Sequence, residues 1–288
     1  LDLVGVPPSR KELHQFLADP SAAAYRQVVD RLLEDPRYGE RWGRHWMDVW
    51  RYSDWYGRRQ VDDVRNSFPN IWRWRDWIID SLNEDKGYDQ MIREMLAADE
   101  LYPADDDRIV ATGFLVRNWF SLNYDTWMRD VVEHTGKAFL GLRMNCALCH
   151  DHKYDPITQE DYFRFRAFFE PLEVRNDRVP GGPRLEKYVR YKPGSGASLK
   201  PGPSGLARIY DFTLDATTRM YRLGDQRDLF TDRPPVQPGV PGFLGELPQP
   251  IAIIDLPAEA HYPGIKRFVQ EAELKTRQQA LAAATEKA

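Results

Sequence analysis

The sequence is poor in several features that would define a protein class. Only two of its 288 residues are cysteines, too few for a domain built on a disulfide framework. No run approaches the roughly 18 apolar residues that a membrane-spanning helix needs. The net charge of −4 lacks the basic surplus of a general nucleic-acid binder. We therefore expect a globular chain with no transmembrane segment and no nucleic-acid partner.

The two ends of the sequence suggest a piece of a longer protein. The chain begins with Leu1 and shows neither an initiator Met nor the basic and apolar regions of a signal peptide. Residues 271–288 are rich in Ala, Gln, Glu and Lys, which predicts a helix that continues past the last residue.

Apolar residues at steps of three and four predict a series of helices in the first part of the chain. Ser9 and Glu12 form a predicted capping box at the first start, and Thr158 opens the last helix of the series. The predicted helices cover approximately residues 10–17, 20–33, 38–52, 70–82, 89–96, 109–120, 125–142 and 158–169.

The composition changes after Pro171. Residues 180–250 hold 11 of the 21 prolines, which predicts long loops. Short strands are expected at 208–214, 219–223 and 251–256. We thus expect a mainly α fold with a Pro/Gly-rich loop lobe that contains a few short strands. The predicted division is a helical domain at 1–175, the lobe at 176–262 and the start of a C-terminal helix at 263–288.

Both cysteines belong to one motif, Cys146-Ala147-Leu148-Cys149-His150, which is the attachment pattern of haem c. Two thiols three positions apart lie on one side of a helical turn, where they can bond to the two vinyl groups of one haem. The histidine that follows can then bind the iron through a ring nitrogen. The motif predicts that the helical core bears one covalent haem c, with His150 as the proximal ligand.

Two other chemistries use a cysteine pair at this spacing. A structural zinc site needs further Cys or His ligands at a suitable spacing, and the sequence has no second cysteine pair. A thioredoxin-like redox site favours a βαβ context, whereas the surroundings here are predicted to be helical. Haem is favoured over thiol redox chemistry and over a metal site.

The motif stands among segments that together resemble a known family. These segments are residues 38–54 (YGERWGRHWMDVWRYSD), 74–79 (WRDWII), 139–142 (FLGL), 146–156 (CALCHDHKYDP), 221–222 and 238–241 (PGVP). The chain resembles the cytochrome-associated domain of unknown function found in large planctomycete proteins. The resemblance covers nearly the whole chain.

The resemblance carries several expectations. Members of the family usually follow a small cytochrome c-like domain and precede other domains of unknown function. The resemblance therefore implies an exported protein, periplasmic or at the cell surface, with a neighbouring cytochrome domain or a redox protein as its partner. By association, it also suggests a carbohydrate partner through polysaccharide breakdown.

The second axial ligand of the iron is open on sequence grounds. His45 is favoured, because it shares a predicted helix face with Trp42 and other aromatic residues. His152 is too near His150 to reach the opposite haem face. His134 would lie roughly 24 Å from His150 along a continuous helix, at about 1.5 Å per residue, so it qualifies only if Gly136 or Gly141 breaks that helix. Further alternatives are a Met ligand (Met47, Met128 or Met144) and an open or water-bound site.

Other residues near the motif have both a functional and a structural interpretation. Arg44 and Arg143, with Arg41 and Arg51, could bind haem propionates or form solvated helix faces. Trp42 is predicted to contact the haem, although Trp42, Trp46 and Trp50 more simply predict an aromatic core. The acidic residues from Asp151 to Asp161 could hold a metal such as calcium, but a turn and a helix cap are favoured.

Three functions follow from these predictions. The favoured one is electron transfer by a c-type haem module within a larger exported protein. The second is a haem-dependent oxidoreductase with an open iron site, in which His45 would be a distal residue. The third is a structural module stabilised by haem. Iron coordination distinguishes the first two.

Overall fold

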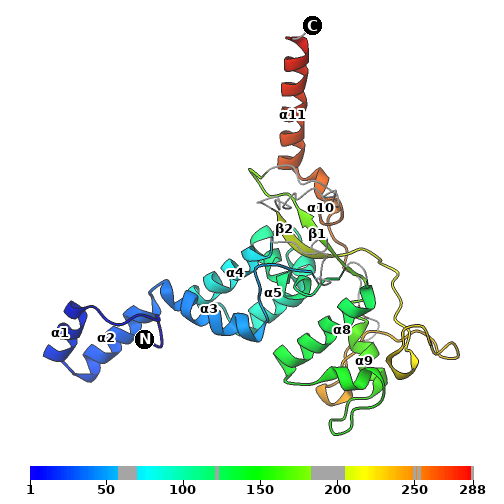
Figure 1. Ribbon diagram of the computed structural model, residues 1–288, viewed down its shortest axis with the longest axis horizontal. Helices are drawn as coiled ribbons and strands as arrows, with labels where there is room; N and C mark the ends of the chain where they lie inside the picture. Colours follow the sequence, from blue (N-terminus) through cyan, green and yellow to red (C-terminus); the bar gives the residue numbers. More distant parts are fainter. Residues whose placement is uncertain (58–69, 121–122, 183–204, 249–250, 252–253, 287–288) are drawn as a thin grey trace, which may run out of the picture.

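A computed structural model describes residues 1–57, 70–120, 123–182, 205–248, 251 and 254–286. The predicted fold class is confirmed, because helices make up most of the described chain and the described strands form one small sheet (Figure 1). None of the helices in these ranges is both long and apolar enough to cross a membrane.

The described elements follow one another in a long helical series, a two-stranded sheet and a helical end. In chain order they are α1 (Arg10–Ala18), α2 (Ala22–Leu33), α3 (Arg37–Val49), α4 (Trp72–Asn83), α5 (Tyr88–Leu101), α6 (Asp106–Ile109), η1 (Val110–Thr112), α7 (Gly113–Val116), α8 (Tyr124–Thr135), η2 (Gly136–Leu140), η3 (Met144–Leu148), α9 (Gln159–Arg166), β1 (Leu172–Asp177), β2 (Leu206–Asp211), η4 (Arg222–Gly224), η5 (Gly242–Leu244), α10 (Ala258–His261), η6 (Pro263–Ile265) and α11 (Arg267–Thr285).

Local side-chain caps begin several of these helices. Ser9 forms the predicted capping box with Glu12 at the start of α1, and Thr158 forms one with Asp161 at the start of α9. Each box satisfies backbone N–H groups that the helix leaves without an internal partner. These starts were therefore predictable from the sequence.

Helix α3 packs closely on α4. A side chain at Gly39 would place its Cβ 2.4 Å from the carbonyl oxygen of Ile79, so only glycine allows this approach. Beyond it, Trp46 and Trp50 stack with their ring centroids 5.1 Å apart, and Trp50 is fully buried. The aromatic core predicted for this part of the chain is confirmed for Trp46 and Trp50. It is wrong for Trp42, which is exposed.

Several predicted boundaries in the first half of the chain are wrong. Helix α3 ends at Val49 instead of residue 52, because Arg51 takes a left-handed conformation with φ 59°. Helix α4 begins at Trp72 instead of residue 70, and its N-cap Ile71 makes no side-chain hydrogen bond. The helix predicted over 109–120 is instead the short succession α6, η1 and α7, which ends at Val116. Within it, the Thr112 hydroxyl donates to the Ile109 carbonyl at 2.8 Å, so this turn tightens to a 3₁₀ form.

The long helix predicted over 125–142 stops at Thr135. A π-helical turn over η2 follows, and Gly141 then takes a left-handed conformation with φ 67°. The chain reverses there, and the Leu142 amide donates to the Gly136 carbonyl at 3.0 Å. This reversal brings η3 back against α8 and α9.

The sheet pairs β1 with β2 in antiparallel register, from Leu172 opposite Asp211 to Asp177 opposite Leu206. The predicted strand at 208–214 corresponds to β2, but β1 was not predicted. The strand predicted at 219–223 is only a pair of isolated bridges, Thr218 with Val236 and Tyr221 with Leu229. The described positions of 251–256 form no strand, and residues 252–253 lie outside the described residues.

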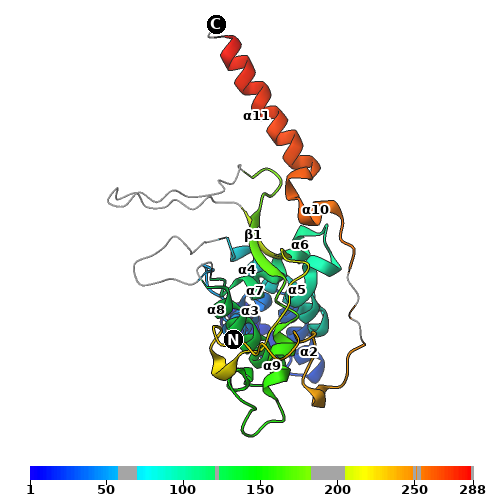
Figure 2. The ribbon, with the colours of Figure 1, turned by 90° about the vertical axis from the view of Figure 1, so that its right-hand side faces the viewer.

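The two ends of the chain project from the body. Helices α1 and α2 lie at one extremity (Figure 1), and α11 extends from another (Figures 1 and 2). None of these three helices contains a buried residue. The body that positions the candidate site therefore consists of α3 to α9, the sheet and the following loops.

Candidate functional site

The two cysteines lie on one 3₁₀ turn at the reversal after α8. Element η3 spans Met144–Leu148 and Cys149 is its C-cap. Ala147 and Leu148 are buried, whereas Cys146 is exposed and Cys149 is half-buried. Both thiols are free. The buried pair anchors the turn in the core, so Cys146 lies at the surface while Cys149 is partly covered.

His150 is exposed and held in one orientation by its own backbone neighbour. Its Nδ1 lies 2.7 Å from the carbonyl oxygen of Asp151. Because a carbonyl only accepts hydrogen bonds, Nδ1 carries a proton, and in this tautomer Nε2 is the nitrogen that can bind a metal. Histidines that bind metals are commonly oriented by such a second hydrogen bond.

The polar residues after His150 build a turn and a helix start. The Nδ1 of His152 accepts the backbone N–H of Asp155 at 2.9 Å, and Asp151 accepts the N–H of Gln159 at 2.8 Å. The carboxylate of Asp161 belongs to the capping box of α9. This confirms the predicted turn and cap. Among the described residues, no group of three or more His, Cys, Asp or Glu side chains is arranged to hold a metal ion.

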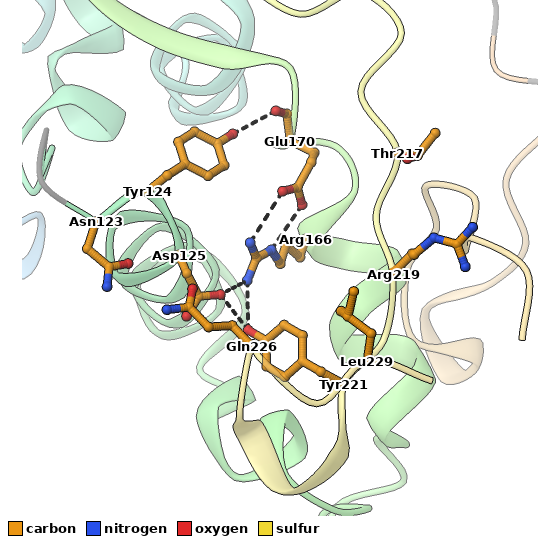
Figure 3. A pocket seen from close by; sticks show the side chains of 10 residues that line it. All are labelled: Asn123, Tyr124, Asp125, Arg166, Glu170, Thr217, Arg219, Tyr221, Gln226 and Leu229. Atoms are coloured by element: carbon orange, nitrogen blue, oxygen red, sulfur yellow. Dashed lines mark hydrogen bonds and ion pairs between the residues drawn. The ribbon is translucent and has the colours of Figure 1, made fainter. Parts of the chain in front are cut away.

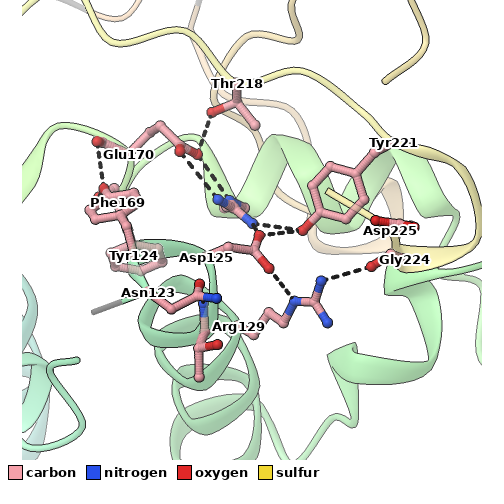
Figure 4. A network of polar contacts seen from close by, with 12 residues as sticks. Asn123, Tyr124, Asp125, Arg129, Phe169, Glu170, Thr218, Tyr221, Gly224 and Asp225 are labelled. Atoms are coloured by element: carbon pink, nitrogen blue, oxygen red, sulfur yellow. Dashed lines mark hydrogen bonds and ion pairs between the residues drawn. The ribbon is translucent and has the colours of Figure 1, made fainter. Parts of the chain in front are cut away.

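A buried polar network lies beside this turn, between α8, α9 and the loop after the sheet (Figure 4). The Asp125 carboxylate accepts hydrogen bonds from Arg166 and from the Tyr221 hydroxyl, both at 2.5 Å. Arg129 forms an ion pair with the same carboxylate at 2.6 Å. Glu170 accepts from Arg166 at 3.0 Å and from Thr218 at 2.9 Å.

The network fixes the charge states of its members. Burial opposes ionisation of Asp125, but the hydrogen bonds from Arg166 and Tyr221 outweigh it and lower the pKa of this carboxyl. Burial raises the pKa of Tyr221 to about 12, although Arg166 acts in the opposite direction. Asp125 is therefore an ionised acceptor and Tyr221 a neutral donor at neutral pH.

An open cavity of about 510 Å³ borders the network. Its side chains are drawn in Figure 3, with Arg166 between Asp125 and Glu170 and with Arg219 turned away from them. The acidic groups are already bonded to Arg166, Tyr221 and Thr218. The charged residues on this side of the cavity therefore neutralise one another. Their hydrogen bonds connect the loop after the sheet to α8 and α9.

The residues predicted from α3 lie on its exposed side. The ring centroids of Trp42 and His45 are 5.5 Å apart in an edge-on arrangement, and Tyr38 continues the stripe at 6.3 Å from Trp42. Arg44 is exposed. The predicted aromatic stripe exists, but it faces away from the buried Gly39 and Gly43 that contact α4.

The other candidate ligands are dispersed. Met128 and Met144 are fully buried, while Arg143 is exposed next to η3. His134 is a candidate ligand only if a glycine interrupts the helix between it and His150, and Gly141 does interrupt the chain there. Burial, followed by the nearby Arg51, lowers the pKa of His134 to about 3, so this ring is neutral at neutral pH.

The residues of the motif fit a covalent haem. Two free thiols lie three positions apart on one turn, and the neighbouring imidazole presents Nε2. The sequence did not point to Gly224, which packs against Cys149, or to Arg129, which donates to the Gly224 carbonyl. Nothing in the local sequence could have shown this contact, since it joins distant segments.

Residues 1–174 match the model of a family described as PSCyt2, protein of unknown function (DUF1549). The chain belongs to this family. The PSCyt2 match includes α3, α8, the cysteine motif and α9, and it ends within β1. No curated protein and no solved structure matches the chain.

Proposed function

We propose that this member of the PSCyt2 family carries one covalent haem c and transfers electrons within a larger exported protein. The observation that carries the proposal is the geometry of the motif. Cys146 and Cys149 are free thiols on one 3₁₀ turn, the first exposed and the second half-buried, and the Asp151 carbonyl holds His150 with Nε2 available.

Each residue of the motif has a separate task in this proposal. Each thiol adds across one vinyl double bond, so that sulfur bonds to one carbon and hydrogen to the other, with no oxidant required. His150 binds the iron through Nε2 while Asp151 keeps the imidazole oriented. When bound, haem c supplies reversible one-electron chemistry. The exposure of Cys146 and His150 favours a site at the surface, where a redox partner can approach.

The mass of the denatured chain tests the cofactor. Expression with a cytochrome c maturation system should add the mass of one haem, and expression without it should add none. Replacing either cysteine with serine should remove one thioether bond, and replacing both should abolish attachment. An unmodified mass after maturation would overturn the proposal.

Two histidine variants test the proximal ligand. His150→Ala should change the visible spectrum of the matured protein, because an axial ligand is lost. His152→Ala is the matched control, since His152 accepts backbone hydrogen bonds within its own turn. Equal spectral changes in the two variants would exclude the role proposed for His150.

The same spectrum separates electron transfer from catalysis at an open site. A six-coordinate, low-spin iron supports electron transfer, whereas a five-coordinate or water-bound iron supports an oxidoreductase. Export is part of the proposal, because covalent haem attachment takes place outside the cytoplasm. The complete parent gene should therefore encode an export signal. A carbohydrate partner rests on the family resemblance alone.

A further inference from the structure

The two cysteines of the motif have different surroundings. Cys146 is exposed, but Cys149 is half-buried beneath a turn that comes much later in the chain. A Cβ on Gly224 would lie 2.5 Å from the Cys149 sulfur and 3.5 Å from Leu148 Cγ. The backbone of Gly224 therefore lies against this sulfur and leaves no room for a side chain.

The covering turn, residues 222–225, has a strained conformation. Leu223 and Gly224 are both left-handed, with φ 49° and 75°. Glycine adopts this region freely, whereas leucine does so at a cost. The Leu223 side chain is 81% exposed, so its own packing does not offset that cost. Other contacts must hold the turn in place.

Arg129 provides such a contact. One of its terminal nitrogens donates to the Gly224 carbonyl at 2.7 Å, and its Nε pairs with Asp125 at 2.6 Å. Asp125 is itself fixed by Arg166 and Tyr221. Figure 4 shows Arg129 reaching from α8 between Asp125 and the Gly224 backbone. The turn is thus tied to the buried network through one guanidinium.

We propose that the 222–225 turn is a cover that controls access to the Cys149 sulfur, with Arg129 as the positioning residue that holds it closed. The cover makes the two thiols chemically unequal. A group that bonds to Cys149 has to approach a sulfur that Gly224 covers on one side. In the proposed haem module, this group is the second vinyl of the haem. Only the identification of the group as a haem vinyl rests on the proposed function.

Thiol alkylation of the haem-free folded chain tests the cover directly. A short pulse of iodoacetamide, followed by peptide mass analysis, gives the rate for each cysteine separately. In the unaltered chain Cys146 should react faster than Cys149. Arg129→Gln should raise the Cys149 rate by about tenfold, since a hydrogen bond from a charged donor is lost, and should leave the Cys146 rate unchanged.

Gly224→Ala is the second variant, and it should also expose Cys149 selectively because its Cβ cannot fit beside the sulfur. Gly181→Ala is its matched control: Gly181 has nearly the same φ, 73°, but nothing within 4 Å of the added Cβ. Arg227→Gln is the control for Arg129→Gln. Arg227 is an exposed arginine next to the turn, and it forms an ion pair with Asp225. Both controls should keep the original ratio of the two rates.

The proposal is overturned if the Cys149 rate stays constant in both variants, or if both thiols accelerate equally, because equal acceleration reports general loosening of the fold. The outcome does not depend on haem. A chain that never accepts haem can still show the selective exposure of Cys149, and a matured chain with one haem can fail to show it.

Discussion

The side-chain amide of Gln159 joins the carbonyl oxygens of Leu148 and Tyr221, donating to the first at 2.9 Å and to the second at 3.0 Å. One residue at the start of α9 therefore connects the cysteine turn to the loop that follows the sheet. Both acceptors are backbone carbonyls. This contact therefore requires the Gln159 amide but does not require particular side chains at positions 148 and 221.

Gln159→Ala should lower the free energy of unfolding by about 2 kcal/mol, because two part-buried carbonyls lose their donor. Gln279→Ala, on the exposed face of α11, is a control with a similar change in size and should leave stability unchanged. Urea unfolding of both variants measures the difference. Equal midpoints would show that the bridge contributes nothing to stability.

Asp125→Asn should cost about 2 kcal/mol at neutral pH, because it removes one of the two carboxylates that pair with the buried guanidinium of Arg166 and leaves only Glu170. The pKa of Asp125 is lowered in the folded chain, so the unfolded state binds more protons near its ordinary pKa of about 3.9. The stability contributed by Asp125 is therefore present above that value and is lost as the pH falls through the folded pKa.

Unfolding measured from pH 3 to pH 7 checks this dependence. Below about pH 4, the slope of the unfolding free energy against pH should be smaller in Asp125→Asn than in the unaltered chain. Asp107→Asn, at an exposed position, should keep the full slope. A variant of Asp125 with the original acid slope would contradict the assignment of an ionised Asp125 to the network.

Asp99 should affect stability in the opposite pH direction. Burial raises its pKa to about 7, although Arg208 acts against the shift. The folded chain holds this proton between the unfolded pKa of about 3.9 and about pH 7, while the unfolded chain releases it. Stability should therefore fall as the pH rises through this window.

Asp99→Asn removes that titration. Its unfolding midpoint should therefore fall less between pH 5 and pH 8 than the midpoint of the unaltered chain does. Thermal unfolding at the two pH values measures the effect. An unchanged pH dependence would show that Asp99 is already ionised in the folded chain at pH 5.

His45 remains our candidate for the haem face opposite His150. In the matured protein, His45→Ala should convert a low-spin spectrum to high-spin if His45 binds the iron, and should reduce peroxide reactivity if it lies over an open site. His14→Ala, on the exposed surface of α1, is the control. If His45→Ala matches His14→Ala in spectrum, potential and reactivity, then His45 has no role at the haem.

Features set by neighbouring residues were predictable from the sequence. The capping boxes at Ser9 and Thr158 depend on side chains three positions away, and the cysteine motif is contiguous. Strand β1 was missed because Leu172–Asp177 carries several charges, and its pairing with Leu206–Asp211 is a long-range contact. The cover of Gly224 over Cys149 is of the same long-range kind.

The position of the cover in the chain has a consequence for the order of assembly. The contacts that shape the cysteine turn are local, such as Leu142 with Gly136 and Met144 against Gly136. Local contacts form early, and chains emerge from the ribosome from the N-terminus onward. The turn with both thiols can therefore form without Gly224, which comes 75 residues after Cys149. Until Gly224 packs beside it, the Cys149 sulfur lacks its cover.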